Sequence, residues 1–279
     1  MSKNKALRDQ FIALTLTVLT CFILIGFLYL EILFLNTFMH EQISLHIKLS
    51  GVLVGVVIYL KTSIDFAMFI GRLMDKNPGL KGRVGIEIGT ALGNAVGTMA
   101  ILLIWSFFKE VSWLLAIMIL LAALVLMKLA EDSLEHVDIE HLPYPGPIKK
   151  LIQIFATVLK TTNKITNPFL SKIVPKSSLS VETKIGLMSL LATAFTVPFI
   201  LGLDDFAGYV PLFNIVNVFA FGIGVFVGHM ILNIFLYISP KRTIAIVKNS
   251  VISILGSVAF VILAIWGAFE AIKLLFHLG

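Results

Sequence analysis

Carboxylate side chains stand inside two apolar stretches of this chain, and both stretches carry a similar motif. The first motif is Ile64-Asp65-Phe66-Ala67-Met68-Phe69, and the second is Asp204-Asp205-Phe206-Ala207-Gly208-Tyr209. They share the pattern Asp-Phe-Ala-x-aromatic. A carboxylate in the centre of a membrane helix costs about 2.5–3.5 kcal/mol on insertion scales, so it normally faces the protein interior and has a partner. We therefore interpret Asp65, Asp204 and Asp205 as candidate ligands of a metal cation.

Each of these aspartates also has an interpretation without ligand binding. Lys61 stands four residues before Asp65, which is the spacing of an ion pair within a helix, and the same lysine could neutralise an empty site. The second pair lies near one end of its stretch, where Asp204 and Asp205 could be solvated loop residues. Glycines on both sides of that pair favour a broken helix whose freed carbonyl groups bind an ion: Gly202 and Gly208. Depending on the alignment, Asp65 matches either Asp204 or Asp205.

A second pair of motifs follows the first pair along the chain. Gly89-x-x-x-Gly93-Asn94 parallels Gly224-x-x-x-Gly228-His229, so Asn94 and His229 hold equivalent positions and join the candidate ligands. Other polar residues on the same stretches or near their ends are candidates for a substrate pathway: Lys61, Glu87, Thr90, Asn214, Asn217 and Asn233. The alternatives are ordinary ones. Glu87 could extend to the membrane surface, His229 could form a hydrogen bond between helices, and Asn214 and Asn217 could cap and pack.

The elements that must position these residues are membrane helices. The chain is 58% hydrophobic and only 14% charged, with a mean hydropathy of +0.98, whereas a soluble protein has about 25% charged residues. Seven apolar stretches are each long enough to cross a bilayer as a helix: residues 11–35, 49–74, 84–108, 111–129, 184–203, 210–238 and 251–276. We predict an all-α polytopic membrane protein with seven transmembrane helices in a bacterial-type plasma (inner) membrane.

Lysine and arginine predict the orientation of these helices. With the N-terminus inside, 18 of the 22 lysine and arginine residues fall in inner segments, as the positive-inside rule requires. The first helix of one motif pair then runs opposite to the first helix of the other, so the two copies are inverted. We predict an N-terminal transmembrane helix (1–44), a first three-helix repeat (45–130), a cytoplasmic loop (131–183) and a second, inverted repeat (184–279). The loop is expected to hold an amphipathic helix on the inner leaflet over 148–159 and a flexible linker from Asn163.

Other features exclude some chemistries and leave further partners open. The single cysteine, Cys21, excludes a disulfide within the chain and a thiolate metal cage. No nucleotide-binding motif is present, and the net charge of +6 reflects inner-loop lysines, so no cofactor and no nucleic acid is expected. The acidic loop around His136 and His141 is either a solvated charge run or a weak collector of divalent cations. A glycine stripe serves internal packing or a homodimer: Gly85, Gly89, Gly93 and Gly97.

With these motifs and this topology, the chain resembles the lysine-exporter superfamily of transporters. Thr62-Ser63-Ile64-Asp65 is similar to the start of the motif in the cadmium-resistance transporters, and the architecture resembles the TerC family and the Golgi calcium/manganese antiporters. The resemblance implies that Asp65 and either Asp204 or Asp205 bind the transported cation. The chain departs from both patterns, because Phe66 stands where the cadmium type has a second aspartate, and no glutamate precedes either motif as in the Golgi type.

We therefore expect a secondary transporter that exports a divalent cation such as manganese or calcium, since oxygen ligands prefer such ions. A proton or sodium ion is the expected coupling ion, and the bilayer is the remaining partner. Amino-acid export is an alternative within the same superfamily. An intramembrane aspartyl protease using Asp65 and Asp204 is an alternative of another class, although we expect no enzyme. A scaffold without transport is the last alternative.

Overall fold

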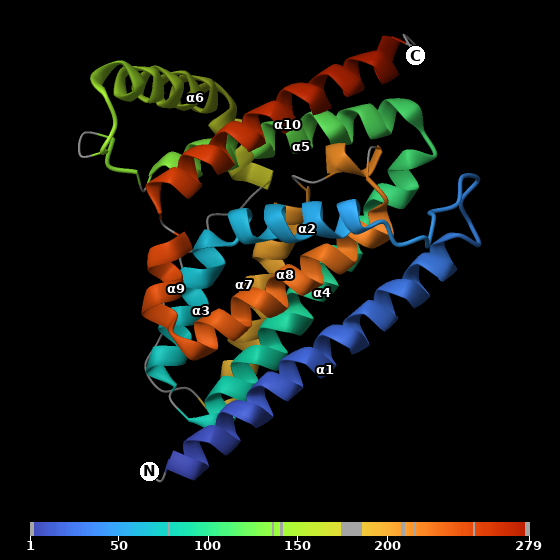
Figure 1. The fold of residues 1–279 in the computed structure, drawn as a ribbon. Coiled ribbons are helices and arrows are strands. Elements are labelled where there is room, and N and C mark those ends of the chain that lie inside the picture. Colours follow the sequence, from blue (N-terminus) through green and yellow to red (C-terminus); the bar gives the residue numbers. More distant parts are fainter. Residues whose placement is uncertain are drawn as a thin grey trace. The chain divides into compact units, whose positions relative to one another are not determined.

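The computed structural model describes residues 3–77, 79–135, 137–139, 142–173, 186–207, 210–214, 216–247 and 249–276. Among these residues the regular elements are all helices (Figure 1). In chain order they are α1 (Lys3–Leu35), α2 (Leu49–Thr62), α3 (Ile64–Lys76), α4 (Leu80–Lys109), α5 (Ser112–Glu135), α6 (Gly146–Ile173), α7 (Leu187–Ala207), the 3-10 helix η1 (Val210–Asn214), α8 (Val218–Ile238), α9 (Pro240–Val247) and α10 (Ser250–Phe276).

Five of the described helices are long and apolar enough to cross a membrane: α1 over Phe11–Leu35, α4, α5, α8 and α10. The bent pair α2 and α3 makes a sixth if it counts as one span. The remaining predicted stretch, the fifth, contains α7, whose apolar part is a shorter helix, Leu187–Phe199. The prediction of an all-helical membrane protein is confirmed, whereas the count of seven spans and the inward N-terminus stay predictions.

Large apolar side chains on the outside of these helices support the membrane assignment. Phe11 and Phe22 of α1 are about 70% exposed, and Leu255, Ile265 and other residues of α10 are exposed in the same way. Contiguous apolar surface of this extent is rare on soluble monomers. On a helix in a bilayer it faces lipid tails and carries no penalty, because those tails are as apolar as leucine.

The second predicted stretch is broken where its aspartate motif begins. α2 ends at Thr62, α3 begins at Ile64, and the two helices meet at an angle of 66°. A straight helix over 49–74 was therefore wrong. The break predicted at Gly202 is not present, because α7 continues through Gly202 to Ala207. Gly208, the second glycine of that prediction, lies outside the described residues. The helix break that the structure describes lies at the first motif, and Asp65 lies in the first turn of α3.

The chain divides into two compact units, and the first holds α1 to α3, most of α4, α7 up to Phe206, and α8. Glycines bring two helix pairs of this unit together. A Cβ on Gly224 of α8 would come within 2.2 Å of the Val52 carbonyl oxygen of α2. A Cβ on Gly93 of α4 would come equally close, at 2.2 Å, to the Phe195 carbonyl oxygen of α7. The predicted glycine stripe on α4 is thus occupied by α7 within the chain.

Both glycine-packed pairs run parallel. Along α4, Gly85 meets Leu187 and Gly93 meets Phe195, so residue numbers rise together on α4 and α7. Along α8 the same is true against α2, where Gly51 meets Ala220 and Gly228 meets Tyr59. The third predicted stretch therefore packs on the fifth, and the sixth packs on the second, which is the reciprocal arrangement that an inverted repeat of these helices requires.

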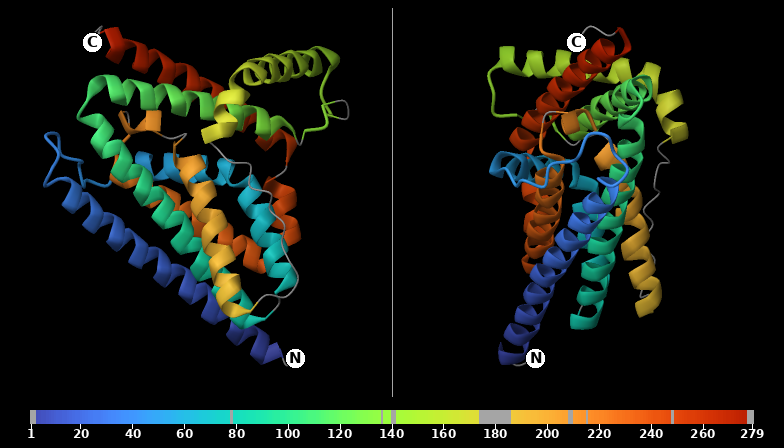
Figure 2. Two further views of the ribbon diagram at one scale, coloured as in Figure 1. Left: turned by 180° about the vertical axis from the view of Figure 1, so that it is seen from behind. Right: turned by 90° about the vertical axis from the view of Figure 1, so that its right-hand side faces the viewer.

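α1 extends along α4 and α8 in the first unit (Figures 1 and 2). Its buried positions recur at helical spacing, as the core face of a helix requires: Ala13, Thr17, Cys21, Leu24, Leu28, Ile32 and Leu35. Tyr29 also contacts Phe219 of α8, with the ring centroids 6.0 Å apart. α1 is thus part of the helical core of this unit.

The second unit is built from α5, α6, η1 and α10. Ser257 of α10 donates a hydrogen bond to the Ala130 carbonyl oxygen of α5 at 2.6 Å. α6 covers the predicted amphipathic helix over 148–159 and continues to Ile173, so the linker predicted from Asn163 is helical as far as it is described. The reason is a tertiary contact, because the Asn163 side chain is buried and donates to Glu131 Oε2 at 2.7 Å.

Candidate functional site

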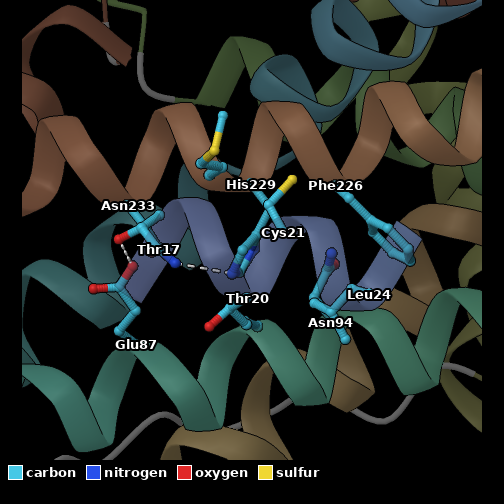
Figure 3. Close-up of a pocket in the computed structure, with 11 residues that line it drawn as sticks. Thr17, Thr20, Cys21, Leu24, Glu87, Asn94, Phe226, His229 and Asn233 are labelled. Atoms are coloured by element: carbon cyan, nitrogen blue, oxygen red, sulfur yellow. Dashed lines mark hydrogen bonds between the residues drawn. The ribbon is translucent and has the colours of Figure 1, made fainter. Parts of the chain in front are cut away.

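A small cavity lies between α1, α4 and α8 in the first unit (Figure 3). Its water-accessible volume is about 10 Å³, which is space for about one water molecule or one ion without its hydration shell. The lining residues are Thr17, Thr20, Cys21 and Leu24 of α1, Glu87, Ala91 and Asn94 of α4, and Phe226, His229, Met230 and Asn233 of α8. Four of the residues predicted from the sequence are therefore brought together here: Glu87, Asn94, His229 and Asn233.

Asn94 and His229 meet at this cavity because α4 and α8 cross in opposite directions. The Asn233 amide of α8 contacts Thr90 Oγ1 of α4 at 3.4 Å. One turn later on α4 comes Asn94, and one turn earlier on α8 comes His229. Asn94 and His229, which hold matched positions in the predicted repeat, therefore line the same cavity.

His229 is held by hydrogen bonds at both ring nitrogens. Its Nδ1 lies 2.7 Å from the Tyr59 hydroxyl of α2, and its Nε2 lies 2.9 Å from Asn233 Nδ2. Thr90 donates to the Glu87 carbonyl oxygen at 3.1 Å, so its oxygen accepts from Asn233 Nδ2, which fixes the orientation of that amide. The amide then donates to Nε2, and Nδ1 carries the proton. In this arrangement His229 is neutral, and it binds a metal only if one of these bonds breaks.

Glu87 is buried, with only 2% of its surface exposed. Its carboxyl oxygen Oε1 contacts the hydroxyl of Thr17, which also donates to the Ala13 carbonyl oxygen of its own helix at 3.1 Å. Figure 3 shows the Glu87 and Thr17 side chains directed toward one another across the α1–α4 contact. The interpretation in which Glu87 extends to the membrane surface is wrong in this structure, because the side chain points into the helix core.

Some polar atoms beside the cavity have no partner among the residues that the structure describes. They are Asn94 Nδ2, Thr98 Oγ1 and Asn233 Oδ1, and all three residues are at most 5% exposed. A buried polar atom without a hydrogen bond costs about 1–3 kcal/mol. The cavity therefore offers both a donor and an acceptor to a small polar guest.

The predicted aspartates are located only by their helices. Asp65 lies at the start of α3, Asp204 and Asp205 lie in the last two turns of α7, and their side chains are outside the described part of the structure. Ser63 stands at the break before Asp65, 1% exposed, and no described group bonds its hydroxyl. Lys61 lies half-buried in the last turn of α2. Among the described side chains no three His, Cys, Asp or Glu residues come together as metal ligands, so the predicted metal site stays a prediction.

The two asparagines predicted as pathway residues on either side of the start of α8 have different outcomes. Asn217 caps α8, because its Oδ1 accepts from the Ala220 backbone N–H at 2.7 Å. Its Nδ2 donates to the Ser44 carbonyl oxygen at 2.8 Å, which ties the preceding loop to the helix. These bonds explain the residue without a pathway role. Asn214 lies in η1, and its side chain is outside the described residues.

Sequence reasoning missed the contributions of α1 and α2 to this site. Small side chains recur at helical spacing in the apolar helix α1, at Thr17, Thr20 and Cys21. This stripe was a usable signal for a helix contact. Gly51, Gly55 and Tyr59 also recur every four residues on α2. That stripe indicated the partner of Gly224 and Gly228 and, at its end, the hydroxyl that meets His229.

Comparison with known proteins does not extend this description. No protein-family model matches the chain, and no curated protein or solved structure is similar to it. The resemblance to the lysine-exporter superfamily therefore rests on the motifs and the topology alone.

Proposed function

We propose that this protein is a secondary transporter that moves a divalent metal cation across the plasma membrane, with export as the direction that the resemblance implies. The observation that carries the proposal is the reciprocal glycine packing of α4 on α7 and α8 on α2, with Asn94 and His229 at the crossing. A core of inverted repeats with buried polar groups where the repeats meet is an architecture of secondary transporters.

The helix break at the first aspartate motif supports a cation as the substrate. α2 ends at Thr62, and this end carries the negative pole of the helix dipole and the last carbonyl groups of the helix. The unpartnered Ser63 hydroxyl and the Asp65 carboxylate belong to the same segment. In transporters, freed carbonyls at such breaks coordinate ions. We infer that Asp65, together with Asp204 or Asp205 of α7, supplies the charged ligands, with Asn94 near the crossing as a neutral one.

The described residues that line the cavity include Asn94 but none of the aspartates, and the cavity is too small for an amino acid. A water-accessible volume of about 10 Å³ accepts one water-sized guest, whereas an amino acid needs several times that space. Oxygen ligands of this kind suit Mn²⁺ or Ca²⁺ rather than a thiolate-seeking metal.

The test is a calorimetric titration of the purified protein with MnCl₂, CaCl₂, CdCl₂ and ZnCl₂. We expect saturable binding of at least one ion in the wild type and its loss in Asp65→Asn. Asp75→Asn is the matched control, because Asp75 lies in the same helix but is exposed at its far end. Binding that is equal in all three proteins would place the ion elsewhere, and no binding to a folded wild type would refute the divalent-cation proposal.

Transport itself is measured in proteoliposomes as exchange of the ion that binds. The Asp65→Asn variant should lose this exchange, and Asp75→Asn should retain it. A wild type that binds the ion but never exchanges it would point to the scaffold alternative.

A further inference from the structure

The Thr17 hydroxyl lies beside two oxygen atoms and has one hydrogen to donate. Thr17 Oγ1 lies 3.1 Å from the Ala13 carbonyl oxygen and also contacts Glu87 Oε1. If Glu87 is ionised, both neighbours are acceptors and must share the single hydrogen of the hydroxyl. If Glu87 carries a proton, it donates to Thr17, which in turn donates to Ala13, and each contact is a full hydrogen bond.

No positive side chain forms an ion pair with Glu87 among the residues that the structure describes, and no lysine or arginine lines the cavity. Arg83 stands four residues before Glu87 on α4, but its guanidinium group lies 4.6 Å from the centre of the Tyr237 ring and donates to the Tyr237 carbonyl oxygen at 3.3 Å. The other titratable groups that face the cavity are Cys21 from α1 and His229 from α8. His229 is neutral in its hydrogen-bond network. A buried carboxylate without a compensating charge is strongly unfavourable, so the charge is balanced most simply by a proton on Glu87 itself.

The neighbouring cavity has space for a water molecule that accepts this proton. Its volume suffices for about one such molecule. Asn233 Oδ1 would accept a hydrogen bond from such a water, and Asn94 Nδ2 would donate one, since neither atom has a described partner. A water between these two amide groups would lie in the cavity that Glu87 also lines. Such a water accepts the proton from the carboxyl group or returns it.

From this geometry we propose that Glu87 carries the coupling proton of the transporter and that α1 responds to its protonation through Thr17. The coupling role of Glu87 rests on the proposed transport function, whereas the protonation of Glu87 does not. In the balanced step, the O–H bond of the Glu87 carboxyl group breaks, the proton passes to the cavity water, and the carboxylate remains. Thr17 then has one hydrogen for two acceptors, so the contact between α1 and α4 and the contact within α1 must share it.

Infrared difference spectroscopy of the purified protein tests the proton without any transport. A protonated carboxyl group has a C=O stretch above the bands of a carboxylate. We expect wild type minus Glu87→Gln to contain this band near neutral pH. Glu270→Gln is the control, because Glu270 also lies in a membrane helix, α10, but its carboxylate is paired with Lys273 at 3.6 Å. Thr17→Val should move the Glu87 band to higher frequency, since the carboxyl group loses its hydrogen-bond partner.

Coupling is measured with a pH-sensitive dye trapped in proteoliposomes, as protons moved per divalent cation exchanged. In Glu87→Gln we expect the coupled proton movement to be lost, so that this ratio falls to the background of the assay, while Glu87→Asp and Glu270→Gln retain it. An unchanged ratio in Glu87→Gln would overturn the coupling. Absence of the Glu87 carboxyl band would overturn the proposal as a whole. If the wild type exchanges no divalent cation, the proposed function fails, and the infrared band still decides whether Glu87 carries a proton.

Discussion

Replacing Gly224 by alanine tests the close contact between α8 and α2. The added Cβ would lie 2.2 Å from the Val52 carbonyl oxygen and 2.9 Å from Gly55 Cα. Carbon–oxygen contacts across packed helices are about 3.3–3.6 Å, so the two backbones must separate by about 1 Å. Backbone atoms cannot rotate out of the way as the end of a side chain can. Gly224→Ala therefore acts on the whole helix pair and on the Tyr59–His229 bond that joins its far end.

The expected cost is that of overpacking a close contact, about 1–3 kcal/mol, reduced by up to about 1 kcal/mol because alanine favours the helix over glycine. With a shift of about 2–4 °C per kcal/mol for a chain of this size, the melting temperature in detergent should fall by several degrees. Gly26→Ala is the matched control, because Gly26 is exposed on α1 and nothing lies within 4 Å of its added Cβ. It should melt like the wild type or slightly higher.

The reciprocal packing adds a second condition to this prediction. Gly93→Ala places its Cβ 2.2 Å from the Phe195 carbonyl oxygen of α7, so it should lower the melting temperature by a similar amount. If Gly224→Ala melts with Gly26→Ala, α2 and α8 are not in close contact, and the reasoning fails. If only one of the two glycine variants is destabilised, the two helix pairs are not equivalent, and the inverted repeat loses its main support.

The hydrogen bonds described here give further predictions, each read from melting curves in detergent. Tyr59→Phe leaves a buried nitrogen of His229 unpaired and should cost about 1–3 kcal/mol; an unchanged curve would mean that the bond is not formed. Asn217→Ala removes the cap of α8 and should cost about 1 kcal/mol without changing cation binding, so weaker binding would restore a pathway role. Ser257→Ala removes one bond to Ala130 and should cost only about 0.6 kcal/mol, the smallest effect of the three.

The sequence was sufficient for features that repeat along a helix. Long apolar stretches predicted membrane helices, and glycines at intervals of four predicted close contacts, as Gly93 and Gly224 show. Glu87 was predicted as a pathway residue and Asn94 as a ligand, and both line the same cavity. Such patterns are readable because a helix places every third or fourth residue on one face.

The features that depend on a partner helix were not readable in this way. The break after Thr62 has no glycine or proline at the junction, so no local propensity marked it. The glycines around Asp204 gave a stronger local signal, yet α7 stays helical through Ala207. Asn163 resembled a linker residue because its hydrogen bond to Glu131 joins helices that are far apart in sequence. Tertiary contacts overrode local preference in each case.

α1 contacts the two halves of the predicted repeat differently at the level of Glu87. In that repeat, matched positions of α4 and α8 differ by 135 residues, so the counterpart of Glu87 is Gly222. α1 contacts both positions: Thr17 meets Glu87, and Leu28 lies so close to Gly222 that an added Cβ would be 2.7 Å from its Cδ2 atom. A glutamate at the second position would therefore displace α1. The aspartate motifs occur in both halves and suit a site shared between them, whereas one carboxyl group beneath an extra helix suits a site that belongs to one half only.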